Sequence, residues 1–139
     1  MKMIPEIKAA WFEALRSGKF AQSTGALSGS AGYCCLGVLC VVLKEKFPES
    51  STAKNIELDY ERIYCDGVKT SMRAQNWTNL FLPMDDNIRL YDAREVLIQM
   101  NDKGTVNETL CKENDLPIPK IAYPRHDFTE IANYIEANF

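Results

Sequence analysis

Apolar residues recur at three- and four-residue spacing close to the N-terminus, as one face of a helix requires. The residues on this face are Ile4, Ile7, Trp11 and Leu15. Pro5 suits the first helical turn, and Gly18 lies where a left-handed cap commonly ends a helix. The pattern predicts a helix over residues 5–17.

A second segment, residues 34–43, is apolar on nearly all sides and ends in the polar run Lys44-Glu45-Lys46. Its length and polar exit favour a central buried helix over residues 34–47. A buried strand is the alternative, because Val38, Val41 and Val42 are β-branched.

Helical spacing returns over residues 93–100 and again at the C-terminus. Asp127 and Glu130 are spaced as in a capping box, which predicts a last helix over residues 127–138. The prolines between residues 116 and 124 cannot continue a helix, so that stretch should run extended across the surface.

The remaining segments read as two hairpins, a short helix and a polar loop. Residues 19–27 and 32–34 flank the small residues 28–31, and residues 56–65 and 68–72 bracket the turn-forming pair Asp66-Gly67. Residues 75–82 form a short helix in this interpretation, and residues 49–55 a polar loop. The predicted fold is α+β, with about four helices around a small, mostly antiparallel sheet.

Composition narrows the class of protein. With 139 residues, 46% hydrophobic and 25% charged, residues 1–139 should form a single compact domain. No secretory leader or apolar run of membrane-spanning length is present, so we expect a cytosolic protein with free thiols. A net charge of −3 argues against duplex nucleic acid as a partner, and nothing in the composition forbids a homodimer.

The sharpest enzyme hypothesis is a cysteine hydrolase. Cys34 or Cys35 would be the nucleophile, activated at a helix start, and His126, the one histidine of the sequence, would be the base. The commoner explanation of such cysteines is burial in the core. The cysteine spacing fits no structural zinc pattern. Neither of the phosphate-binding glycine motifs, G-x-x-x-x-G-K-[ST] and G-x-G-x-x-G, is present, so we expect no metal and no cofactor.

Cationic and aromatic residues able to grip phosphates and stack on bases are spread along the chain. The candidate ligand-binding residues are Arg16, Lys19, Gln22, Arg62, Tyr64, Arg73, Trp77 and Arg89. Lys69 and Arg94 belong to the same broader set of cations. The same residue types also mark protein interfaces or form an ordinary solvated surface, so the sequence leaves these alternatives open.

Four stretches resemble a family of small bacteriophage and prophage proteins of unknown function that carry a Cys-Cys-Leu-Gly-Val-Leu-Cys block. They are residues 11–27, 32–40, 100–104 and 128–136. Typical relatives lack the segment 105–127 that intervenes here. The resemblance implies a phage origin, and by analogy a counter-defence role in the host cytosol.

Such a protein would sequester a nucleotide immune signal or occlude a host defence protein. The two roles predict different surfaces. A nucleotide needs a concave basic pocket, whereas a protein partner needs a broad apolar and aromatic patch.

Overall fold

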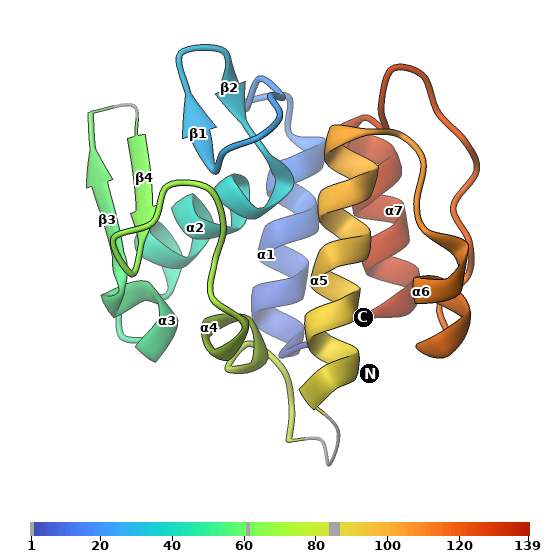
Figure 1. Cartoon of the computed structure of the whole chain (residues 1–139). Coiled ribbons are helices and arrows are strands. Elements are labelled where there is room, and N and C mark those ends of the chain that lie inside the picture. The colour runs from blue at the N-terminus through green and yellow to red at the C-terminus, as the bar shows by residue number, and fades with distance from the viewer. Residues whose placement is uncertain (1, 61, 84–86) are drawn as a thin grey trace.

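The computed structural model describes residues 2–60, 62–83 and 87–139, and within them the chain folds as an α+β domain (Figure 1). The helices are α1 (Pro5–Arg16), α2 (Cys35–Lys46), α3 (Ser51–Lys54), α4 (Ala74–Thr78), α5 (Asn87–Asp102), α6 (Glu108–Glu113) and α7 (Phe128–Asn138). The strands are β1 (Ser28–Gly29), β2 (Gly32–Tyr33), β3 (Ile56–Asp59) and β4 (Arg62–Cys65). The predicted fold class is confirmed.

The long helices form the body of the molecule. Helix α1 packs against both α2 and α7, and α5 contacts α2, α4, α6 and α7. Figure 1 shows the two hairpins on the α2 side of this body and α6 on the opposite side, next to α5. Buried apolar residues from all these helices gather in a hydrophobic cluster, so the hairpins stand on a packed helical base.

Helix α2 is the central buried element, and the helical interpretation of its sequence is confirmed. Every residue from Cys35 to Cys40 is buried, as are Val42 and Leu43. The indole of Trp11 in α1 donates a 2.9 Å hydrogen bond to the carbonyl of Cys35. A helix that is apolar all round can be stable only where neighbouring elements cover it on all sides, as they do here.

The other helix predictions are confirmed with altered bounds. At α7, the Asp127 side chain accepts from the Glu130 amide and the Glu130 side chain accepts from the Asp127 amide, so the capping box is present. Helix α5 begins earlier than predicted, at Asn87. Helix α3 lies in the stretch predicted to be a polar loop, and α6 lies where no element is predicted, because elements of 4 and 6 residues are too short to show periodicity.

The single predicted sheet is wrong: the described strands form two separate two-stranded antiparallel sheets. Strands β1 and β2 close around residues 30–31, but β1 lies within the predicted turn, and residues 19–27, predicted as the first extended piece, form no strand. The predicted strand over residues 56–65 is split, because the chain reverses between Asp59 and Arg62 to pair β3 with β4. Asp66 and Gly67 do form a tight turn with positive φ angles of 55° and 74°, but only a single bridge, Cys65 to Val68, follows it.

Helix α2 and the segment before β1 touch backbone to backbone at Gly37. A Cβ atom added at Gly37 would lie 1.7 Å from the carbonyl oxygen of Leu27. The same carbonyl accepts a 3.2 Å hydrogen bond from the amide of Cys34, and the amide of Leu27 donates a 2.9 Å bond to the carbonyl of Lys69. This contact therefore fixes β1 against the start of α2 and against the chain that follows β4.

We expect Gly37→Ala to lower the free energy of unfolding by about 2 kcal/mol or more, because backbone atoms cannot yield to the new methyl group as a side chain would. Gly29→Ala is the matched control, since its Cβ would meet no atom within 4 Å. Urea unfolding of both variants measures the effect. Equal stability of the two variants would contradict a tight contact at Gly37.

Candidate functional site

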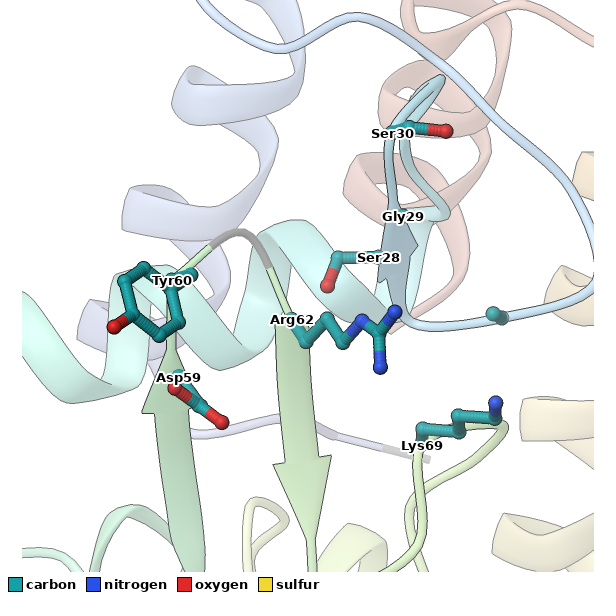
Figure 2. Close-up of a pocket in the computed structure, with 8 residues that line it drawn as sticks. Ser28, Gly29, Ser30, Asp59, Tyr60, Arg62 and Lys69 are labelled. Carbon is teal, nitrogen blue, oxygen red and sulfur yellow. The ribbon is translucent and has the colours of Figure 1, made fainter.

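An open cleft of about 680 Å³ lies between the β1–β2 hairpin and the β3–β4 hairpin (Figure 2). Its volume falls within the range of small-molecule sites. The residues that line it are Ala26, Ser28, Gly29, Ser30, Asp59, Tyr60, Arg62 and Lys69. They come from both hairpins and from the chain after β4, so the cleft exists only in the folded protein.

Hydrogen bonds between the elements set the spacing of the cleft walls. The Ser28 hydroxyl on β1 accepts a 2.8 Å bond from the amide of Ile63 on β4. Lys69 is held by the bond between its carbonyl and the Leu27 amide and by the preceding Asp66-Gly67 turn. The walls are thus held by backbone groups and by the Ser28 hydroxyl, while the side chains of Arg62 and Lys69 remain exposed.

Two cations meet on one side of the cleft. Figure 2 shows the Arg62 side chain extending from β4 toward β1, with the Lys69 amine on the same side. Among the described residues, no carboxylate lies within 4.0 Å of either cation, although five ion pairs form elsewhere. Two like charges without a counter-ion attract an anion, and a guanidinium and an ammonium both bind phosphate well.

Tyr60 lies at the tip of the β3–β4 hairpin, and its ring is on the opposite side of that hairpin from the Arg62 guanidinium (Figure 2). Its ring is fully exposed, and its backbone is left-handed, with φ of 54°. A bulky residue rarely adopts this conformation, and such strain is found preferentially at binding and catalytic sites. An exposed aromatic ring that lines the same cleft as two cations can stack on the base of a nucleotide whose phosphate the cations hold.

Of the eight candidate residues named from the sequence, the cleft contains Arg62. Arg16 forms an ion pair with Glu136 and lies over the Phe12 ring at 4.8 Å. Lys19 borders a separate hollow of about 240 Å³, whose described lining carries two lysines and two glutamates. These charges balance, so this hollow does not select an anion.

The other candidates lie outside the described lining of the cleft. Trp77 is fully buried, 5.8 Å from the ring of Trp11, and its predicted role in stacking on a ligand is wrong because no ligand can reach it. Arg73 lies 4.0 Å from Asp66, and Arg89 lies 3.6 Å from Asp115. Tyr64 is half-buried on β4, opposite Glu57.

Gln22 belongs to a buried junction built around Asn101. The side-chain oxygen of Asn101 accepts 3.1 Å bonds from the Gln22 amide group and from the backbone amide of Cys35, and its nitrogen donates to Ser23 and Asp102. Here the cysteine block and the Asn-Asp segment, which carry the resemblance described above, meet in space. Because Asn101 is fully hydrogen-bonded and the adjoining cavity is only about 40 Å³, the junction suits a structural role.

The cysteine residues proposed as nucleophiles lie in unfavourable surroundings for a thiolate. Burial raises the pKa of Cys34 from 9.0 to about 11, although the Gly37 amide donates to its sulfur at 3.4 Å. Burial also raises the pKa of Cys35 well above its usual value. Within the described part of the chain, neither thiol is hydrogen-bonded to His126, whose Nε2 lies 2.5 Å from the Lys120 carbonyl. This geometry gives the cysteine hydrolase no support.

The described residues contain no group of three or more His, Cys, Asp or Glu side chains arranged to hold a metal ion. Over residues 2–60, 62–83 and 87–139, no helix combines the length and the apolar character needed to cross a membrane.

Fold and cleft together define a small α+β domain with an open cationic cleft between two hairpins. The chain belongs to the family described as Domain of unknown function (DUF8296), which matches residues 3–139. No curated protein and no solved structure matches the chain.

We expect all five thiols to react slowly with a disulfide reagent in the native protein. At pH 7.5 a thiol of pKa near 11, such as Cys34, is about a hundredfold less ionised than one of pKa 9.0, and the thiolate is the reactive form. The labelling rate should rise as the pH approaches 11 and should become fast for every cysteine in guanidinium chloride. A native thiol that reacts within seconds at neutral pH would restore the enzyme hypothesis.

Proposed function

We propose that this protein is a phage-encoded binding protein that sequesters a nucleotide signal of host defence in the host cytosol. The observation that carries the proposal is the pair of cations Arg62 and Lys69, which have no carboxylate within 4.0 Å among the described residues and line the same cleft as the exposed Tyr60. Cations, an aromatic ring and hydroxyl groups around a concave space are the chemistry that a nucleotide requires.

The composition of the cleft favours retention of a ligand over its chemical conversion. Among the described residues that line it, none is a histidine or a cysteine, and Asp59 is the one carboxylate. Hydrolysis of a phosphodiester needs a positioned base or a metal ion, and this lining pairs no two groups in that way. A protein that holds the ligand without turnover acts by lowering its free concentration.

The phage origin and the counter-defence role rest on the sequence resemblance and on analogy with other small phage proteins. The cationic cleft supports a nucleotide as the target.

Occlusion of a host protein is the second candidate function, and a different surface favours it. In the segment between α6 and α7, Ile121 and Tyr123 are 82% and 98% exposed. The segment is anchored, because Ala122 donates a 3.0 Å hydrogen bond to Gly104 and Tyr134 donates one of 2.9 Å to Pro117. Large apolar side chains displayed on a fixed segment are typical of protein contacts.

We expect the double variant Arg62→Ala, Lys69→Ala to bind a nucleoside diphosphate about tenfold to a hundredfold more weakly than the unmodified protein, since each lost charge-assisted bond contributes about 1.5–3 kcal/mol before screening by solvent. Lys112→Ala on α6 is the control, because it removes an exposed lysine far from the cleft. Isothermal titration calorimetry at two salt concentrations measures the loss. Unchanged affinity in the double variant would contradict the cleft as the binding site.

The natural ligand can be recovered directly. The purified protein is incubated with lysate from phage-infected, defence-carrying cells and then denatured, and the released small molecules are analysed by mass spectrometry. We expect an intact nucleotide from the unmodified protein and much less from the double variant. Release of no nucleotide, with a host protein retained through Ile121 and Tyr123, would support occlusion instead.

A further inference from the structure

The charges of the cleft are divided between two sides, one acidic and aromatic and the other basic. Asp59 and Tyr60 lie at the end of β3, whereas the Arg62 guanidinium and Lys69 lie toward β1 (Figure 2). An elongated ligand with a phosphate at one end would place its other end against Asp59 and Tyr60. The chemistry of Asp59 and Tyr60 therefore determines which chemical group fits at that end of the ligand.

Asp59 is an exposed carboxylate that faces the cleft. It pairs with Arg62 across the β3–β4 ladder, yet no ion pair joins the two side chains. No hydrogen bond to its carboxylate is found within the described part of the chain. Both carboxylate oxygens are therefore open to N–H donors of a ligand, since an ionised carboxylate can only accept hydrogen bonds.

The nucleobases differ in what they offer to a carboxylate. Guanine presents two adjacent donors on its Watson–Crick edge, the ring N1–H and the exocyclic amino group, which match the two oxygens of one carboxylate. Adenine and cytosine place a ring nitrogen acceptor beside their amino group, and uracil flanks its single N–H with two carbonyl oxygens. Those acceptors would be repelled by the carboxylate.

Tyr60 adds the second requirement for a base. Its exposed ring is adjacent to Asp59 in the chain and both residues line the same cleft, so a base stacked on the ring can turn its edge toward the carboxylate. Stacking alone tolerates every base, because each has a π-face. Discrimination between the bases therefore has to come from the Asp59 carboxylate.

We propose that the cleft selects guanine nucleotides, with Asp59 accepting from the guanine edge, Tyr60 stacking on the base, and Arg62 and Lys69 holding the phosphates. This inference rests on the proposed function and specifies the ligand class of the same site. It requires no chemical step, so the ligand leaves the cleft unchanged.

The test compares guanosine 5′-diphosphate, adenosine 5′-diphosphate and inorganic pyrophosphate by calorimetry on the full chain. We expect the guanine nucleotide to bind about tenfold or more tightly than the adenine nucleotide. In Asp59→Asn this ratio should fall to near one, while pyrophosphate binding is kept or strengthened. Retained pyrophosphate binding shows that the variant is folded.

Glu57→Gln is the matched control, because it removes a carboxylate from the same strand that does not line the cleft. It should keep the guanine preference. Equal binding of the two nucleotides by the unmodified protein, or a preference that survives Asp59→Asn, would overturn the guanine assignment and leave the anion site standing. Failure of all three ligands to bind would overturn the anion site and the guanine assignment together.

Discussion

Leu27 is pressed against the first turn of α2 because residue 37 has no side chain. With Gly37 there, the Leu27 carbonyl reaches the helix surface and accepts from Cys34, while its amide reaches the chain after β4 at Lys69. One residue thereby positions three segments that are distant in sequence. The cleft is a consequence of this contact, since β1 forms one of its walls and Lys69 its cationic edge.

The groups that hold the cleft walls differ from the side chains that line the cleft and carry its charge. Backbone groups and the buried Ser28 hydroxyl form the hydrogen bonds that hold the hairpins. The side chains of Arg62, Lys69, Asp59 and Tyr60 remain exposed. Preorganised walls reduce the entropy lost when a ligand is ordered. An open, charged cleft on a packed helical base is therefore suited to capture a small anion from solution.

The helices could be predicted from the sequence because their evidence is local: the spacing in α1, the apolar run of α2 and the capping box of α7 need no tertiary information. The β3–β4 turn was missed because Tyr60 adopts a positive φ without the usual glycine or asparagine signal. Most of the site was missed for a different reason. Ser28 meets Ile63, and Lys69 meets Leu27, only through long-range contacts, so residues forming one cleft carry no common pattern in the sequence.

The most direct test of the account is to record amide chemical shifts of the ¹⁵N-labelled protein while guanosine 5′-diphosphate is added. The account predicts saturable shifts concentrated in residues 28–30, 59–60, 62–63 and 68–70, with α6 and α7 unaffected. Shifts gathered around Arg16 and Lys19 or around Tyr123, or no saturable change at all, would contradict the cleft between the hairpins as the binding site.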